Sequence, residues 1–284
     1  MTAESFDASW LGLREPVDHR SRDRELVALL LREGRSRGWS RVVDLGSGTG
    51  SNVRYLSRRI PWAKEWTAVD HDRSLLDRID HPLQGSVRTI QGDLGGAGLN
   101  ALEGAHVVTA SALLDLVSED WVHSVVDRCV RQGAGVLFVL SYDGVVEWGE
   151  PSADDDLVLE AVNEHQRSDK GLGTALGPRA GGFAAEAFAS AGYRVWTRPS
   201  PWVLRWALDA PLIDSLVLGW IAAAREVRPD ASQKIEQWAM RRFADLARGV
   251  ALRVGHVDVL ALPASTVSTE SGGDAAGASR STTK

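Results

Sequence analysis

The stretch 44–50 reads DLGSGTG, in which three glycines at alternate positions follow an aspartate. Apolar β-branched residues precede it at 42–43, and residues 51–59 can form a helix, so the pattern predicts a strand, a tight turn and a helix N-terminus. Glycine allows positive φ angles and lets a ligand approach the backbone, while the free N–H groups of a helix N-terminus attract electronegative groups. The stretch therefore predicts a nucleotide-type binding turn.

The spacing of the glycines distinguishes between nucleotide-binding motifs. The dinucleotide fingerprint has its third glycine where Ser51 stands here, and the phosphate-binding loop requires a Gly-Lys-Ser/Thr sequence that this stretch lacks. The pattern Asp-x-Gly-x-Gly-x-Gly instead resembles the first motif of the class I S-adenosylmethionine (SAM) dependent methyltransferases. Further landmarks follow in the family's order at Asp70, Asp93 and Ser111, each at the end of an expected strand.

The resemblance implies a role for each landmark. In nucleotide-binding folds of this kind a carboxylate at the position of Asp70 accepts the ribose hydroxyls. Asp93 resembles the family's acceptor for the adenine amino group, and Ser111 occupies the usual fourth-motif site beside the methyl sulfonium. Two alternatives stay open, because Asp70 could cap the next helix and Asp93 could be an ordinary turn residue. The candidate cofactor-binding residues are Asp44, Gly46, Ser47, Gly48, Asn52, Asp70, His71, Asp93, Leu94 and Ser111.

Alternating strand and helix patterns predict the fold class. Strands are expected near 41–45, 65–69, 86–90, 105–110 and 134–140, with helices near 51–59, 72–79 and 119–131 between them. Such alternation predicts an α/β fold with a doubly wound, mostly parallel sheet and helices on both faces. The family resemblance implies seven strands, with an antiparallel final pair supplied by the candidate strands at 193–197 and 250–260.

The remaining segments define the expected domain boundaries. Residues 1–38 are expected to form an N-terminal helical lid, in which Asp18 caps a helix over about 19–37. Residues 39–263 are expected to form the SAM-binding domain. It carries a polar, glycine-punctuated insert at about 143–182, interpreted as facing the substrate, and a helical insertion at about 205–248. Residues 264–284 are rich in Ser, Thr, Gly and Ala and are expected to be disordered.

Composition limits the classes of partner. The net charge of -6 argues against a general nucleic-acid groove. The lack of an apolar run near eighteen residues indicates no membrane span, and the lack of a signal-like start points to the cytoplasm. Cys129 is the only cysteine, so no disulfide within the chain and no metal site are expected. Arginines cluster near the start and are interpreted as a solvated helix face because acids are interspersed among them: Arg14, Arg20, Arg22, Arg24, Arg32, Arg35, Arg37 and Arg41.

The resemblance predicts in-line transfer of a methyl group from SAM to an oxygen, nitrogen or carbon nucleophile. A general base is needed only where the nucleophile holds a proton of high pKa. Candidates for catalysis are Tyr142, Asp143 and His165, and candidates for substrate binding are Arg14, Gln166, Arg167 and Lys170. The expected substrate is a small organic molecule, with specialised metabolism as one source, because the fourth-motif region lacks the sequence typical of DNA-methylating enzymes.

Two other classes of function remain open. A protein that binds SAM without catalysis, as a regulatory or partner subunit, would share the same cofactor residues. A nicotinamide-dependent dehydrogenase would need its third glycine one position later and a Tyr-x-x-x-Lys pair, which is absent. The sequence leaves the acceptor atom and the formation of a homodimer undecided.

Overall fold

The computed structural model describes residues 7–79, 86–169, 171 and 173–264, and one eight-stranded sheet forms its centre. The strands are β1 (Arg41–Leu45), β2 (Glu65–Asp70), β3 (Ser86–Gln91), β4 (Val107–Ser111), β5 (Gly135–Trp148), β6 (Tyr193–Pro199), β7 (Trp202–Leu204) and β8 (Leu252–Pro263). Their order is β3-β2-β1-β4-β5-β8-β6, and the short β7 pairs with β8 off this path. The five strands from β3 to β5 are parallel, whereas β8 runs antiparallel to β5, β6 and β7.

This topology confirms the predicted doubly wound, mostly parallel fold. The expected antiparallel pair is β6 and β8, and β7 is an additional strand that the sequence analysis did not predict. The expected tail lies outside the described residues, apart from Ala264.

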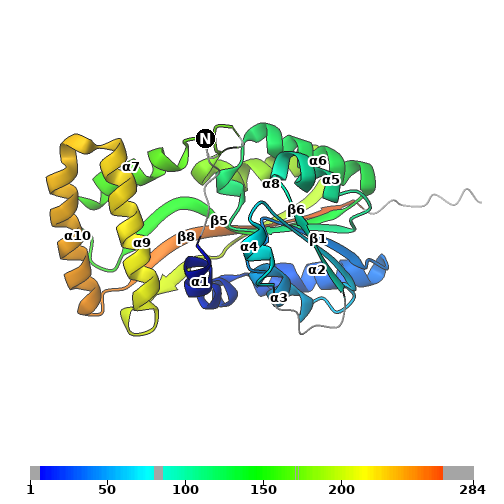
Figure 1. Cartoon of the computed structure of the whole chain (residues 1–284), viewed down its shortest axis with the longest axis horizontal. Coiled ribbons are helices and arrows are strands. Elements are labelled where there is room, and N and C mark those ends of the chain that lie inside the picture. The colour runs from blue at the N-terminus through cyan, green and yellow to red at the C-terminus, as the bar shows by residue number, and fades with distance from the viewer. Residues whose placement is uncertain (1–6, 80–85, 170, 172, 265–284) are drawn as a thin grey trace, which may run out of the picture.

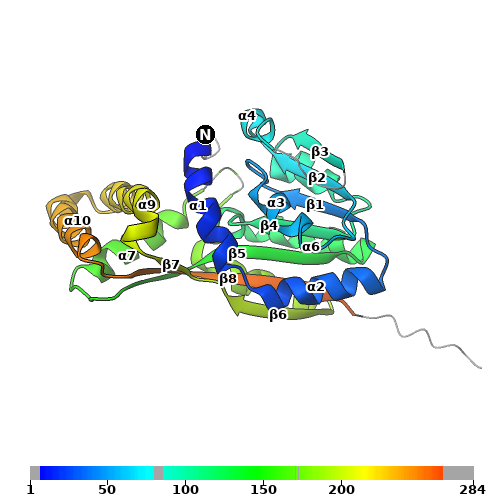
Figure 2. The same ribbon diagram turned by 90° about the horizontal axis from the view of Figure 1, so that it is seen from below.

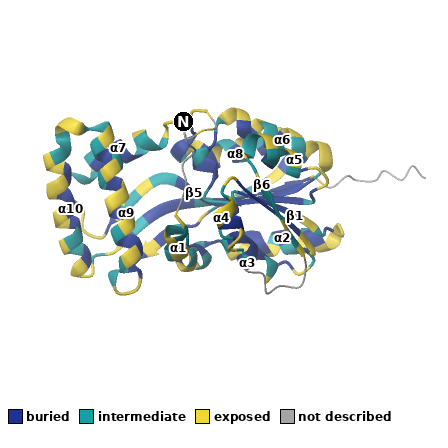
Figure 3. Ribbon diagram, viewed as in Figure 1, coloured by how far each residue is buried: buried dark blue, intermediate teal, exposed yellow. Residues whose placement is uncertain are grey.

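Helices cover both faces of the sheet, so successive strand residues enter different cores (Figures 1 and 2). Val42 faces a core that includes Leu30 of α2, whereas Val43 faces a second core that includes Val125 of α6. Because both faces are covered, the central strands are apolar along nearly their whole length. Their residues are largely buried (Figure 3). The helices around the sheet are α2 (Arg24–Ser36), α3 (Ser51–Ser57), α4 (Arg73–Leu76), α5 (Leu99–Ala101), α6 (Glu119–Gln132) and α8 (Ala180–Ser190).

β5 and β8 continue beyond the other strands and carry a helical lobe at one end of the molecule (Figure 1). The sequence indicated that the fifth strand ends near residue 140, but β5 runs to Trp148 because the chain bulges at Leu140 and resumes pairing. Leu140 has a φ of 56°, and its N–H donates to Asp258 Oδ1 over 2.8 Å. The lobe consists of α7 (Asp155–Gln166), α9 (Trp206–Val227) and α10 (Ser232–Ala247).

Aromatic packing holds the lobe on the strand ribbon. The ring of Trp148 on β5 makes edge contacts with Trp220 of α9 and Trp238 of α10, at centroid distances of 6.4 and 5.9 Å. Arg242 lies over the Trp148 ring at 4.5 Å and pairs with Asp155, which joins α10 to α7. Strand ribbon and helices therefore share one buried cluster.

The N-terminal segment forms two helices, and the boundary between them lies later in the chain than the sequence indicated. α1 (Ala8–Ser21) ends before Arg22, and Asp23 caps α2 by accepting a hydrogen bond from the Leu26 N–H over 2.8 Å. The predicted cap at Asp18 is wrong, because Asp18 lies inside α1 and binds Arg14 and Trp202. The helix stops at residue 22 because this residue takes an extended backbone conformation.

Candidate cofactor-binding site

The glycine stretch forms the turn between β1 and α3. Gly46, Gly48 and Gly50 have φ angles of 62°, 52° and 82°, which other L-residues rarely adopt. The Ser47 N–H donates to the Val69 carbonyl over 3.0 Å, so the turn is fixed to β2. The predicted strand, turn and helix start are therefore confirmed.

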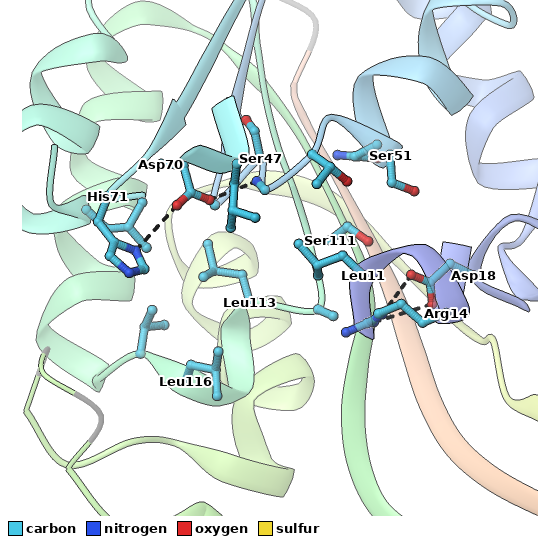
Figure 4. A pocket seen from close by; sticks show the side chains of 18 of the residues that line it. Leu11, Arg14, Asp18, Ser47, Ser51, Asp70, His71, Ser111, Leu113 and Leu116 are labelled. Carbon is cyan, nitrogen blue, oxygen red and sulfur yellow. Dashed lines mark hydrogen bonds and ion pairs between the residues drawn. The ribbon is translucent and has the colours of Figure 1, made fainter. Parts of the chain in front are cut away.

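A cavity of about 200 Å³ lies beside this turn, at the carboxyl ends of the parallel strands (Figure 4). This is where ligands bind in open α/β sheets. Most of the candidate cofactor residues line it: Gly46, Ser47, Gly48, Asn52, Asp70, His71, Asp93, Leu94 and Ser111. Asp44 lies behind them and is only 1% exposed.

Asp70 joins the turn to the end of β2. Its Oδ2 accepts the Gly48 N–H over 2.8 Å, and its Oδ1 accepts the Asp72 N–H over 2.9 Å and lies 3.4 Å from His71 Nδ1. A carboxylate has about four acceptor positions, so capacity for a ligand hydroxyl remains. The N-cap of α4 is Asp72, which accepts the Ser74 N–H over 2.8 Å, so the capping role considered for Asp70 belongs to its neighbour.

Asp93 caps a short helix and also lies on the cavity lining. It is exposed, and it caps the short helix Leu94–Gly98 by accepting the Gly96 N–H. It also lines the cavity, as do Asp70 and His71. Asp93 is therefore both a turn residue and a cavity-lining residue.

A buried polar network lies beneath the cavity, and its central residue is Arg22. Arg22 is 3% exposed, and its guanidinium donates to Asn52 Oδ1 and, over 3.0 Å, to Ser111 Oγ. The Asn52 amide in turn donates to Asp44 Oδ1 over 2.6 Å and to Thr109 Oγ1 over 3.0 Å. The interpretation of the N-terminal arginines as a solvated face is wrong for Arg22, which reaches inward from the junction of α1 and α2.

The network leaves one acceptor atom available. Asp44 Oδ2 is buried and has no hydrogen-bond partner among the described residues. Burial raises the pKa of Asp44 to about 7, against the opposite effect of the hydrogen bond from Asn52. Buried acceptors without partners cost free energy, so this atom suits a ligand that brings a cationic donor.

α1 lies over the cavity and contributes Leu11, Arg14 and Asp18 to its lining (Figure 4). Arg14 Nε donates to Asp18 Oδ2 over 2.9 Å, and Asp18 Oδ1 accepts from Trp202 Nε1 over 3.0 Å. The Leu11 side chain comes so close to the turn that a Cβ atom on Gly48 would lie 3.0 Å from it.

α1 is held on α3 chiefly by polar contacts. Glu15 forms an ion pair with Arg54, and His19 Nε2 lies 3.1 Å from Ser51 Oγ. Arg20, next to His19 near the C-terminal end of α1, pairs with Asp209 of α9 over 2.7 Å. The helix thus rests on both the sheet domain and the lobe, in the position expected for a lid.

The three candidate catalytic residues lie away from the cavity lining. The Tyr142 hydroxyl donates to Asn163 Oδ1 over 2.9 Å, and burial raises the pKa of Tyr142. Asp143 accepts the Val145 N–H over 3.1 Å, and burial likewise raises its pKa. His165 Nε2 lies 3.5 Å from Glu226 of α9, inside the lobe.

The substrate-binding candidates divide in the same way. Arg14 lines the cavity, but Gln166 and Arg167 at the end of α7 do not. Lys170 lies outside the described residues, although its neighbour Gly171 is on the lining. The insert therefore reaches the cavity through its glycine-rich end.

Comparison with known proteins identifies the domain around the cavity. Residues 42–133 match a family model described as a methyltransferase domain. The matched segment contains the glycine turn, Asp70, Asp93 and Ser111. The resemblance to the class I SAM-dependent methyltransferases, and with it the enzyme class and the SAM cofactor, is thereby confirmed for this part of the chain. No curated protein matches.

Three solved structures are similar to this chain at low identity. The YcgJ protein from Bacillus subtilis is 16% identical, with a TM-score of 0.47 and coverage of 86% of this chain and 100% of that one. A putative methyltransferase from Bacillus halodurans is 16% identical, with a TM-score of 0.46 and coverage of 84% and 99%. A SAM-dependent methyltransferase from Thiobacillus denitrificans, in complex with S-adenosyl-L-homocysteine, is 16% identical, with a TM-score of 0.43 and coverage of 91% and 100%.

Proposed function

We propose that this SAM-dependent methyltransferase transfers the methyl group to an oxygen, nitrogen or carbon atom of a small organic metabolite. The observation that carries the proposal is the composition of the cavity. Beyond the cofactor residues its wall is mostly apolar and includes Leu113, Leu116 and Val117. Arg14 is the only lysine or arginine on the lining among the described residues. A nucleic-acid substrate would need several such cations to neutralise phosphates.

The residues around the turn fit the chemical groups of SAM. The free acceptor capacity of Asp70 suits the ribose hydroxyls, and Asp93 suits the adenine amino group. The Asp44 carboxyl lies behind the lining with its Oδ2 unpartnered, and its negative charge, when ionised, favours the ammonium of the methionine part. When bound, SAM supplies a methyl group on a cationic sulfur.

The chain's own part in the transfer is orientation and exclusion of water. Leu11 of α1 packs close to Gly48 of the glycine turn, and Leu113, which follows β4, packs close to Gly46. They enclose the space in which an acceptor meets the methyl group, and a well-oriented acceptor at short range needs little further assistance. The Arg14 guanidinium, aligned by Asp18, offers a fixed donor to an oxygen of the acceptor.

Tyr142, Asp143 and His165 remain predicted catalytic groups. Since they lie off the cavity lining, a transfer that needs no general base agrees with their positions. The substitution His165→Ala tests this directly. Unchanged turnover with an identified acceptor supports transfer by orientation alone, and lost turnover with unchanged SAM affinity assigns His165 a part in the reaction.

A non-catalytic SAM-binding subunit is the second candidate, and the same placement of the three polar residues favours it. Incubation with SAM labelled in the methyl group separates the two candidates. The protein is incubated with this SAM and a cell extract, and transfer of label to the small-molecule fraction supports the proposal. Asp70→Ala is the matched control and should transfer less label. Label in protein or nucleic acid, or no transfer despite saturable SAM binding in calorimetry, contradicts it.

A further inference from the structure

α9 has an outer face that no described part of the chain covers. Leu208 and Leu218 are 75% and 58% exposed, and a Cβ atom on Gly219 would have nothing within 4 Å. Spacings of three and four place these residues on one side of the helix. We define the outer stripe as Leu208, Pro211, Ser215, Leu218, Gly219 and Ala222, all of which are exposed.

The opposite side of α9 is already used within the lobe. Its buried residues include Leu212, Ile213, Val217 and Trp220, which belong to the core shared with α7 and α10. α9 is the one described helix long and apolar enough to cross a membrane, yet only 33% of its most apolar window is buried. Apolar surface of this extent on a folded protein indicates an interaction site.

We propose that the outer stripe is the contact between two copies of this chain, with two α9 helices packed antiparallel about a two-fold axis at Ser215. In this register Leu208 of one copy meets Ala222 of the other, and Pro211 meets Gly219. The large residue of each contact therefore faces a small one. A two-fold interface requires such self-complementarity, because the same patch serves both partners.

Charges at the two ends of α9 agree with this register. Arg205 precedes the helix and is exposed, and the Glu226 side chain near its C-terminus is 76% exposed. Antiparallel packing about Ser215 sets Arg205 of one copy opposite position 225 of the other, one residue from Glu226, and does so twice by symmetry. Glu226, which also lies 3.5 Å from His165 of its own chain, is therefore within reach of Arg205. Opposite charges at both rims fix the register and disfavour the parallel arrangement.

The residue types of the stripe favour a second copy over a membrane surface. A helix that lies on a bilayer presents bulky apolar residues flanked by lysine and arginine. The outer stripe instead includes Ser215, Gly219 and Ala222, whose small side chains let two helix backbones approach. Arg205 lies before the stripe and Glu226 after it, so the two ends carry opposite charges and not two cations. One helix pair about 33 Å long gives an interface at the small end of the specific range, so we expect a dimer of micromolar Kd.

The substitution Ser215→Cys tests the two-fold axis. The native cysteine, Cys129, is buried, so the new thiol is the one available for cross-linking. Mild oxidation of the full-length protein at micromolar concentration should convert most of the variant to a disulfide-linked dimer. Ala244→Cys, at an exposed position on α10, should stay largely monomeric under the same conditions. Equal cross-linking of the two variants overturns the proposal.

Sedimentation of charge variants tests the register. Arg205→Glu and Glu226→Arg should each raise the dimer Kd about tenfold or more, and the double variant should return it to within about threefold of the native value. Met240→Glu, which alters a 65% exposed side chain on α10, should leave the Kd unchanged. A native protein that sediments as a monomer up to about 100 µM overturns the proposal. The proposal is also overturned if the native protein stays monomeric and floats with anionic phospholipid vesicles, and if Leu218→Glu abolishes that flotation.

Discussion

The Arg22 guanidinium donates to Ser111 Oγ over 3.0 Å and thereby connects the junction of the first two helices to the end of β4. The same guanidinium binds Asn52 and lies over the Tyr55 ring at 4.6 Å. Two residues of the cavity lining, Asn52 and Ser111, thus take their orientation from a side chain that does not itself line the cavity. Arg22 is a positioning residue for the cofactor site.

Substitution of Arg22 should affect both stability and cofactor binding. Arg22→Met removes two buried hydrogen bonds and leaves their acceptors without a partner, so we expect unfolding to become easier by about 1–3 kcal/mol. We also expect SAM affinity to fall about tenfold in calorimetry, because Asn52 and Ser111 lose their common donor. Arg24→Met, which alters an exposed neighbour, is the matched control and should change neither quantity. Unchanged SAM affinity in Arg22→Met would show that Arg22 is purely structural.

Asp70→Ala tests the proposed ribose contact. The carboxylate accepts the Gly48 N–H and retains capacity for ligand hydroxyls, so its removal should weaken SAM binding about 10- to 100-fold. Asp77→Ala removes a 57% exposed carboxylate at the end of α4 and should leave the affinity intact. The same affinity in both variants rejects the assignment of Asp70.

SAM affinity should depend on pH through Asp44. Because burial raises the pKa of Asp44 to about 7, the carboxyl is largely protonated below that pH and cannot pair with an ammonium group. SAM affinity should therefore rise by up to about tenfold per pH unit below pH 7 and level off above it. Calorimetry between about pH 5.5 and pH 8.5 measures the effect, and Asp44→Asn should flatten this dependence. An identical slope in the variant would assign the titration to another group.

The pH dependence of folding stability through Asp44 has the opposite sign to that of SAM affinity. The pKa of Asp44 is higher in the folded protein than in the unfolded chain, so the SAM-free folded state binds the proton more tightly. The contribution of Asp44 to stability is therefore complete below the ordinary aspartate pKa of 3.8 and is lost as the pH rises towards about 7. Thermal unfolding of the native protein against Asp44→Asn should show this difference, and bound SAM should reduce it.

Gly48→Ala tests the close approach of α1 to the turn. The residue has a positive φ, and its new Cβ would lie 3.0 Å from the Leu11 side chain. Gly38→Ala has a similar φ of 66° but nothing within 4 Å, so it reports the backbone strain alone, at about 1–2 kcal/mol. Gly48→Ala should lose more stability than this control and weaken SAM binding about tenfold or more. Leu11→Ala in the same chain should recover part of both losses, and no recovery would contradict the contact.

Local patterns in the sequence were enough to predict the sheet and the polar groups at its edge. The central parallel strands are apolar on both faces, as Val42 and Val43 illustrate. Asp70 ends β2, and Asp93 follows the end of β3. In a parallel sheet the carboxyl ends of strands meet at one edge, so residues far apart in sequence converge without any knowledge of packing. The cavity lining follows from that regularity.

Interactions between distant segments could not be predicted in this way. Burial of Arg22 has no local sign among the other N-terminal arginines, since it depends on how α2 docks on the sheet. The length of β5 depends on Asp258, which lies far along the chain and accepts the Leu140 N–H at the bulge. Tyr142 and Asp143, expected at a strand end, consequently lie within a longer strand.

The continuous β5 and β8 strands make the lobe inseparable from the cofactor domain. Tyr142 pairs with His256 and Val146 with Val254, on either side of a change in register, so both strands pass from one part to the other while paired. Inserting a single residue into either strand would turn its later side chains to the opposite face and rotate the three lobe helices with them. Transplanting a lobe from another protein onto this sheet therefore requires that both strand crossings be preserved together.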